Sequence, residues 1–406
     1  MIDRSGNSVG TNDLHDRGFG CESWPLPGAY RNGSAMRAIQ PRWCLLAVTM
    51  FLPWSPAVRA QVQTLTPPIV SGARPVTVEH IKVHGVSLEG NLEKDAVDRD
   101  VIVFLPPSYS RDTRRRFPVV YALHGYSIGA EQWTHEIHVP QTIEGAFAQG
   151  AKEMIVVLPD SKTVYGGSIY SSSVTTGDFE GFIAHDVVAY IDAHYRTLAT
   201  RNGRGLVGHS MGGYGAVRIG MKHPDVFGSV YIMSPGLLAP HPAELPRMGG
   251  GNLTPEQAQR DFEVSVAAMH SPQDAASLPL GARAQLAVAA AWSPNPKNPP
   301  LYLDLPVREG VVEPIILAKW AANAPLAFID QYVGNLHRYR AIGLDVGDED
   351  PGREDARQLE AAFARYGLGV QFEVYHGTHT SAVADRFQNH VLPFFSANLC
   401  HAMPCP

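Results

Sequence analysis

Five residues near the middle of the chain, Gly208 to Gly212, spell G-H-S-M-G and place one serine between two glycines. The apolar pair Leu206-Val207 before them is typical of the end of a buried strand, and the apolar pattern after them, up to His223, is typical of a helix. A sharp strand-to-helix turn of the G-x-S-x-G kind holds its serine in a strained conformation with the hydroxyl exposed. The pattern therefore predicts that Ser210 is a nucleophile.

A serine hydroxyl is a weak nucleophile at neutral pH, so it needs a base and an acid that orients the base. In folds that carry this turn the chain order is serine, acid, histidine, which places the base well downstream. A strand pattern at residues 370–375 leads into the loop His376-Gly377-Thr378-His379-Thr380. A histidine in such a loop can reach back to the serine. We predict His379 as the base, with His376 at the strand end as the alternative.

The acid is expected in the polar turn Gly347-Asp348-Glu349-Asp350-Pro351-Gly352, which follows a strand-like run at residues 339–346. Asp350 is the first choice. Asp348 and Asp345 are the alternatives. Asp348 is also suited to a solvated turn or a helix cap, and Asp345 to local hydrogen bonds at the strand end.

An acyl-transfer site also needs two backbone N–H groups for the negative charge that develops on the carbonyl oxygen. One comes from the residue after the nucleophile, which is Met211. The second comes from the loop after an earlier strand, and the apolar run at residues 117–123 leads directly into His124-Gly125-Tyr126. A glycine there permits a tight bend that presents the Tyr126 N–H, although a plain turn is the alternative. We predict Met211 and Tyr126 as the oxyanion donors.

The chain resembles the esterase D family of α/β-hydrolases, and the resemblance covers most of residues 76–397. The acid turn matches the family's G-x-x-D pattern from Gly347 to Asp350. The histidine loop Gly377-Thr378-His379 departs from the family's G-G-H in its middle residue. The other segments that carry the resemblance are DVIVFLPPSY (100–109), FPVVYALHGY (117–126), HDVVAYIDAHYRT (185–197), LVGHSMGGYGAV (206–217) and HPDVFGSVYIMSPG (223–236).

The resemblance implies an α/β-hydrolase fold, with a mostly parallel central sheet and helices on both faces. We expect no cofactor, since the sequence has no dinucleotide-binding or P-loop fingerprint. It implies a serine esterase with a Ser210–His379–Asp350 triad that hydrolyses carboxylic esters through an acyl-enzyme. Acyl transfer to a sugar or lipid alcohol at the same site is the alternative, and a non-catalytic binding role is a further one. We expect no metal, because His135, Glu136 and His138 lack the spacing of a helical zinc site.

The helix that follows Ser210 leads into a further strand. About a hundred residues, 236–338, separate that strand from the strand before the acid turn, which is longer than the usual connection. The segment Thr254-Pro255-Glu256-Gln257 predicts a capped helix that extends to about His270. Further helix patterns cover residues 278–292 and 314–322. We predict a helical lid over the site, and a structural elaboration packed away from the site is the alternative. The expected pocket residues are Trp292, Tyr302, Trp320 and Phe328.

The N-terminal residues differ in character from the rest. Residues 1–35 are polar and aperiodic, and we interpret them as an extension ahead of a true start at Met36. Residues 36–60 have the charged, apolar and small-residue regions of a signal peptide, which predicts a secreted or periplasmic protein without a membrane span. Residues 61–75 are expected to form a linker to a hydrolase domain at 76–400, followed by a tail at 401–406. In an oxidising compartment Cys400 and Cys405 could form a disulfide.

Composition agrees with this interpretation. A chain of 406 residues with 45% hydrophobic content can bury one large core, and a net charge of −6 carries no nucleic-acid or polybasic membrane signature. The expected partner is a small-molecule or polysaccharide-linked ester, and the oligomeric state is left open.

Overall fold

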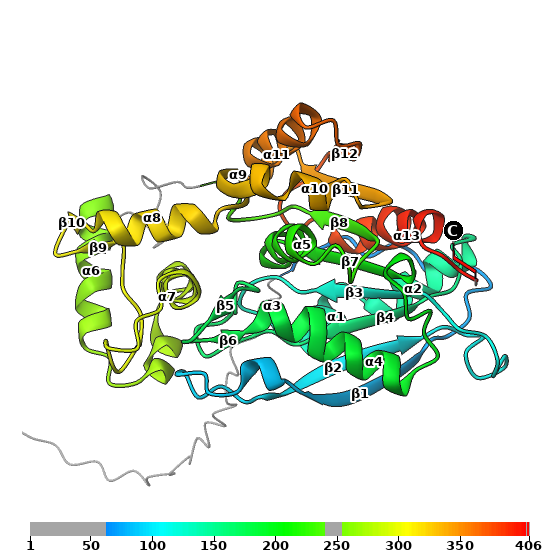
Figure 1. Cartoon of the computed structure of the whole chain (residues 1–406), viewed down its shortest axis with the longest axis horizontal. Helices are drawn as coiled ribbons and strands as arrows, with labels where there is room; N and C mark the ends of the chain where they lie inside the picture. The colour runs from blue at the N-terminus through cyan, green and yellow to red at the C-terminus, as the bar shows by residue number, and fades with distance from the viewer. Residues whose placement is uncertain (1–61, 240–253, 403, 406) are drawn as a thin grey trace, which may run out of the picture. The chain divides into compact units, whose positions relative to one another are not determined.

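A mostly parallel sheet of eight strands organises the computed structural model, which describes residues 62–239, 254–402 and 404–405 (Figure 1). The strand order is β1-β2-β4-β3-β7-β8-β11-β12. Strand β2 runs antiparallel to β1 and β4, and the other neighbours pair in parallel. The strands are β1 (Thr77–His84), β2 (Asp98–Leu105), β3 (Val119–Leu123), β4 (Ile155–Pro159), β7 (Arg204–His209), β8 (Ser229–Met233), β11 (Ala341–Gly347) and β12 (Val370–Tyr375).

Helices cover both faces of the sheet. Each strand contributes side chains to both packed layers, because successive side chains of a strand point to opposite faces. In β3, Val119 and Tyr121 pack into one hydrophobic core, whereas Val120 and Ala122 pack into the other. The first core includes α4 (Val188–His194), α5 (Met211–Lys222) and α11 (Arg353–Arg365); the second includes α1 (Ala130–Glu136), α2 (Val139–Ala148), α12 (Val383–Arg386) and α13 (Leu392–Asn398). The predicted α/β-hydrolase architecture is confirmed.

The elements that were expected to position the site lie where the sequence places them. Strand β7 ends at His209 and helix α5 begins at Met211, so Ser210 forms the turn between them. Strand β11 leads into the acid turn, and β12 leads into the histidine loop. Since β7, β8, β11 and β12 are successive parallel neighbours, their carboxyl ends meet at one edge of the sheet.

Three predicted helices form in the insertion: α6 (Pro255–Ala267), α7 (Leu280–Trp292) and α8 (Pro314–Asn323). Helix α6 begins with the predicted capping box between Thr254 and Gln257. A short hairpin of β9 (Val307–Arg308) and β10 (Val311–Val312) precedes α8, and α9 (Pro325–Phe328) and α10 (Val333–Leu336) follow it. In Figure 1 helices α6 to α8 lie together at the left, beside the sheet. Three consecutive glycines at 249–251 lie outside the described residues.

Three of the four expected pocket residues are buried by packing, namely Trp292, Trp320 and Phe328, whereas Tyr302 is partly exposed. Trp292 is buried, its indole N–H donates to the Ser171 hydroxyl at 3.3 Å, and its ring lies 5.6 Å from that of Tyr214 on α5. Trp320 packs edge-on against Trp292, and its N–H donates to a serine hydroxyl inside the insertion. Phe328 is also buried. These contacts fix the insertion to the core; its predicted role as a lid stays a prediction.

Both ends of the described chain are attached to the domain. The segment expected to be a linker lies against it: Val62 is buried, and the Leu65 N–H donates to the Ser381 carbonyl. Cys400 and Cys405 form a disulfide. The expected extension and signal peptide lie outside the described residues. In the part of the chain that is described, no helix is both long and apolar enough to cross a membrane.

Candidate active site

Ser210 occupies a strained turn at the end of β7. Its φ of 60° and ψ of −115° are unusual for a residue with a side chain, and such strain is typical of functional sites. The flanking glycines make the turn possible, since a β-carbon at Gly208 would collide with the Gly212 carbonyl, and one at Gly212 with the Leu123 carbonyl. The turn leaves the Ser210 side chain partly exposed beside the first turn of α5.

The structure brings together Ser210, His379 and Asp350. His379 Nε2 lies 2.8 Å from Ser210 Oγ, and His379 Nδ1 lies 2.8 Å from Asp350 Oδ2. The Asp350 side chain is only 2% exposed, and its other oxygen accepts the Gly352 N–H at 2.7 Å. The carboxylate therefore cannot rotate freely, and it holds the imidazole with Nε2 toward the serine.

The alternative acids and base have other partners. His376 and Asp348 form a pair of their own at 3.1 Å on the surface, where the His376 side chain is 85% exposed. Asp345 is fully buried in β11 and pairs with Arg386 at 2.8 Å. Two histidine–aspartate pairs thus occur in neighbouring loops, and one of them reaches the serine.

The ionised state of Asp350 favours His379 as the base. Burial on its own would raise the pKa of the Asp350 carboxyl, but the hydrogen bond and the charge of His379 hold the pKa below its usual range. The ionised carboxylate accepts the Nδ1–H of His379. The lone pair of the neutral imidazole is then on Nε2, where it can accept the Ser210 proton.

A second histidine, His209, fixes the loop that carries His379. Its Nε2 donates to the His379 carbonyl at 2.8 Å, and burial lowers the pKa of His209 to about 3, so the ring is neutral at physiological pH. No sequence pattern predicts this role of His209. The only local signal for it is that His209 directly precedes the serine.

The predicted oxyanion donors flank the serine. Met211 is the first residue of α5, where N–H groups have no partner inside the helix. On the other side, a β-carbon at Gly125 would lie 3.6 Å from Ser210 Cβ, so the Gly125–Tyr126 peptide is next to the nucleophile. His124 is buried and orients this peptide: its Nε2 accepts the Ser161 N–H at 2.8 Å, which leaves Nδ1 protonated to donate to the Gly125 carbonyl at 2.9 Å.

That hydrogen bond determines the direction of the Tyr126 N–H. In a planar trans peptide the C=O and the N–H point in opposite directions. The Gly125 carbonyl faces the His124 ring, so the Tyr126 N–H faces away from it. Burial lowers the pKa of His124, which keeps the ring neutral and preserves this arrangement.

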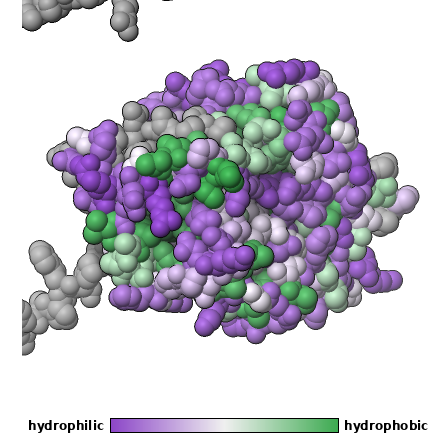
Figure 2. All heavy atoms as spheres, turned by 60° about the vertical axis from the view of Figure 1, so that its left-hand side comes forward, coloured by the Kyte–Doolittle hydropathy of each residue, from purple (hydrophilic) through white to green (hydrophobic). Residues whose placement is uncertain are grey.

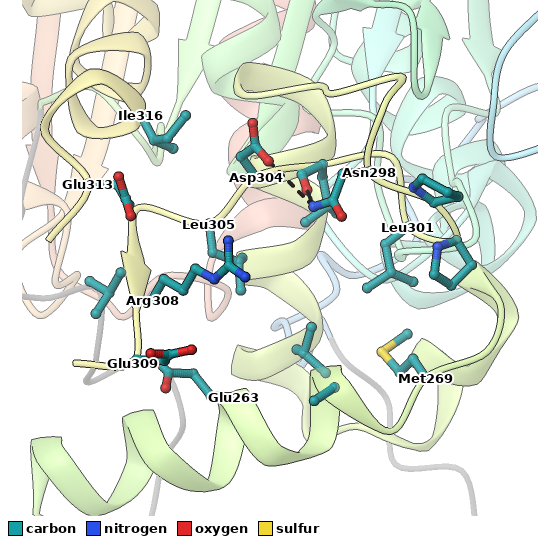
Figure 3. Close-up of a pocket in the computed structure, with 16 residues that line it drawn as sticks. Glu263, Met269, Asn298, Leu301, Asp304, Leu305, Arg308, Glu309, Glu313 and Ile316 are labelled. Carbon is teal, nitrogen blue, oxygen red and sulfur yellow. Dashed lines mark hydrogen bonds between the residues drawn. The ribbon is translucent and has the colours of Figure 1, made fainter. Parts of the chain in front are cut away.

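A cavity of about 620 Å³ opens in the insertion, away from these residues (Figure 3). None of the predicted site residues lines it. Its wall combines apolar side chains such as Leu301 and Ile316 with the charged Glu263, Arg308 and Glu313. Figure 2 turns this side of the molecule forward and shows hydrophobic residues gathered beside hydrophilic ones. Among the described residues of the insertion, the large apolar side chains that are exposed are Val264, Leu280, Val311, Val312 and Ile315.

A strained serine, an imidazole bonded to it, a buried carboxylate behind the imidazole and backbone donors beside the serine can together carry out acyl transfer. On this sheet they define a serine hydrolase of the α/β-hydrolase class. A model of the Putative esterase family matches residues 96–391 of the chain. The chain belongs to that family.

Individual relatives agree with this assignment. Esterase Rv1288 of Mycobacterium tuberculosis is 31% identical over 131 residues, which are 32% of this chain and 27% of that protein. An endo-1,4-beta-xylanase/feruloyl esterase of Xylanibacter ruminicola is 28% identical over 151 residues, or 36% of this chain and 20% of the relative. The chain thus spans a small part of the length of these two relatives.

Solved structures show the same fold. A ferulic acid esterase aligns with 80% of this chain and 99% of its own, with a TM-score of 0.55 and 21% identity. The fluorophosphonate-binding serine hydrolase FphF of Staphylococcus aureus aligns with 80% of this chain and 98% of its own, with a TM-score of 0.51 and 15% identity.

Proposed function

We propose that this protein hydrolyses carboxylic esters through an acyl-enzyme on Ser210. The Ser210 oxygen attacks the ester carbonyl carbon while His379 Nε2 takes its proton, and the N–H groups of Met211 and Tyr126 bind the oxyanion. The tetrahedral intermediate collapses as His379 gives the proton to the leaving alcohol. Water then attacks the acyl-enzyme by the same route and releases the acid. The continuous line of 2.8 Å hydrogen bonds from Asp350 through His379 to Ser210 carries this proposal.

Labelling by a fluorophosphonate, read by intact mass, tests the nucleophile. We expect one adduct on the wild-type chain and none on Ser210→Ala. Hydrolysis of a p-nitrophenyl ester should fall by about 10⁴-fold or more in Ser210→Ala and His379→Ala, because members of a triad act as a unit.

The neighbouring surface pair supplies a matched control. His376→Ala removes a histidine three residues away that is bonded to Asp348 and not to Ser210. We expect it to keep nearly all activity. Loss of activity in His376→Ala with activity retained in His379→Ala would reassign the base, and an unlabelled wild-type chain would refute the serine mechanism.

Export to the periplasm or outside the cell is part of the proposal. The signal-like pattern of residues 36–60 supports it, and the Cys400–Cys405 disulfide suits an oxidising compartment. Expression of the full chain in a bacterial host, followed by intact-mass measurement of the periplasmic fraction, tests it. We expect a chain that begins at Gln61. A chain that keeps residues 36–60 and stays in the cytoplasm would contradict export.

A further inference from the structure

Arg283 reaches from helix α7 of the insertion to the loops around Ser210. A β-carbon at Gly166 would lie 3.0 Å from the Tyr126 hydroxyl oxygen and 3.3 Å from Arg283 Nε, so the two groups meet at this glycine. Gly166 has a φ of +94°, a conformation that suits glycine and leaves the space open. The insertion thus places one guanidinium beside Tyr126.

The same strip of chain connects Arg283 to the proposed oxyanion hole. A β-carbon at Gly167 would lie 2.9 Å from the Tyr126 ring and 3.2 Å from Met211 Cε. Tyr126 and Met211 are the residues whose N–H groups flank Ser210. The guanidinium therefore lies near the hydroxyl end of the Tyr126 side chain, and the backbone N–H of the same residue is a proposed oxyanion donor.

The positive charge of Arg283 has no counter-charge in the described part of the chain. Its Nε is buried without a hydrogen-bond partner, and no described carboxylate oxygen lies within 4.0 Å of the guanidinium. The Tyr126 phenol does not compensate it. Burial raises the pKa of Tyr126 to about 12 although the guanidinium lowers it, and the neutral phenol donates to the Tyr165 carbonyl at 2.8 Å.

A half-buried cation without an anionic partner is unfavourable until an anion binds. The guanidinium has a planar fork of N–H donors that matches the two oxygens of a carboxylate. We propose that Arg283 binds a carboxylate on the substrate, several bonds from the scissile carbonyl. This inference rests on the proposed hydrolysis at Ser210, and it assigns the substrate class as esters that carry a free carboxylate.

Two matched pairs of esters test the assignment. The p-nitrophenyl monoester of adipic acid and p-nitrophenyl hexanoate differ by a carboxylate on the acyl side. The compounds 4-carboxyphenyl butyrate and phenyl butyrate differ by one on the alcohol side. In at least one pair, we expect the ratio of kcat/KM for the anionic to the neutral ester to fall by about 10- to 100-fold in Arg283→Gln. The fall should come mainly from a higher KM for the anionic ester, and Arg283→Lys should restore part of it.

The matched control is Arg308→Gln, which removes an arginine of the same insertion that lines the separate cavity in Figure 3. We expect the ratio to stay at the wild-type value. A fall of the ratio in Arg308→Gln would place the anion site in that cavity and overturn the proposal. An equal loss on both esters of each pair in Arg283→Gln, which a purely structural role predicts, would overturn it too.

Binding to the Ser210→Ala chain separates this inference from the proposed function. Calorimetry with the anionic and neutral esters should show tighter binding of an anionic ester, and Arg283→Gln in the same background should abolish the difference. That difference without any turnover by the wild-type chain would refute ester hydrolysis and leave the anion site in place. Turnover by the wild-type chain without any difference in binding would refute the anion site alone.

Discussion

At the scale of single residues, two similar histidine–aspartate pairs occur close together in the candidate site. His379 with Asp350 contacts Ser210, whereas His376 with Asp348 is three and two residues away along the chain and faces solvent. The buried Asp350 accepts both the imidazole and the Gly352 N–H, so its position is determined by the turn itself. This fixed carboxylate distinguishes the proposed catalytic pair from its exposed neighbour.

The role of His124 leads to a kinetic prediction. Substitution His124→Ala removes the donor that holds the Gly125 carbonyl and so frees the peptide whose N–H is the proposed oxyanion donor. We expect kcat to fall by about 10- to 100-fold with little change in KM, because the lost interaction acts on the transition state.

Steady-state kinetics with p-nitrophenyl butyrate, together with the thermal midpoint of each variant, check this prediction. His209→Ala is not a suitable control, since it would release the His379 loop. Thr142→Val removes a different buried polar group, on α2, and should leave kcat near the wild-type value. An unchanged kcat in a folded His124→Ala chain would show that the peptide keeps its orientation without the ring.

The sequence was sufficient to predict those residues of the candidate site that a local pattern marks. Ser210 is marked by its glycines, and the acid turn and histidine loop follow recognisable strands in the required order. Contacts between segments that are distant in the chain could not be predicted from such local patterns. His124 depends on Ser161, 37 residues later, and Arg283 meets Tyr126 only because the insertion folds back onto the core. Such pairings follow from the packing of elements, which no local pattern encodes.

At the scale of elements, a buried ion cluster connects the insertion to the core. Glu180 of α3 (Phe179–Gly181) accepts from Arg218 of α5 at 2.8 Å and from Lys222 at 3.0 Å. Arg218 also donates to the side chain of Asn323 at the end of α8. One carboxylate thus holds the arginine that joins α5 to the insertion.

The cluster predicts how stability depends on pH. Burial on its own would raise the pKa of Glu180, but His223, Arg218 and Lys222 lower it to about 2 from an unfolded value near 4.5. A lowered folded pKa stabilises the protein above the unfolded value, and this contribution is lost as the pH falls from about 4.5 toward 2. The shift corresponds to about 3 kcal/mol.

Urea unfolding at several pH values measures this contribution. At pH 7 we expect Glu180→Gln to be less stable than the wild type by about 3 kcal/mol, since it leaves Arg218 without its carboxylate. The difference should shrink below pH 4. Asp225→Asn is the matched control, because Asp225 pairs with Arg338 in an exposed position and should contribute much less. A difference that stays constant from pH 7 to pH 3 would contradict the assignment to Glu180.

At the scale of the whole molecule, the first described residues bind the loop that carries His379. We name residues 62–65 the N-terminal clamp. The Leu65 N–H donates to the Ser381 carbonyl at 2.9 Å, and the Thr64 hydroxyl accepts the Ala384 N–H at 3.1 Å. Thr380 donates to the Gln63 carbonyl at 3.4 Å. Segments more than 300 residues apart are therefore held together next to the proposed base.

The clamp connects the proposed export step to activity, because cleavage after Ala60 leaves all four of its residues in place. A chain that begins at Gln61 should have full activity. A chain that begins at Thr66 loses four hydrogen bonds to residues 380–384, together with the buried Val62. It should be less stable by about 3 kcal/mol. Its kcat should fall several-fold, because His379 samples positions away from Ser210 when its loop is released.

Parallel measurement of kcat and of urea unfolding for the two chains decides between two roles of the clamp. Lower stability with an unchanged kcat would limit the clamp to folding. If the two chains had the same kcat and the same stability, the histidine loop would be held by His209 and the turn of Asp350 alone. Thr64→Val in the longer chain removes only the hydroxyl contacts and should give a smaller loss in the same direction, since the Leu65 hydrogen bond and the packing of Val62 remain.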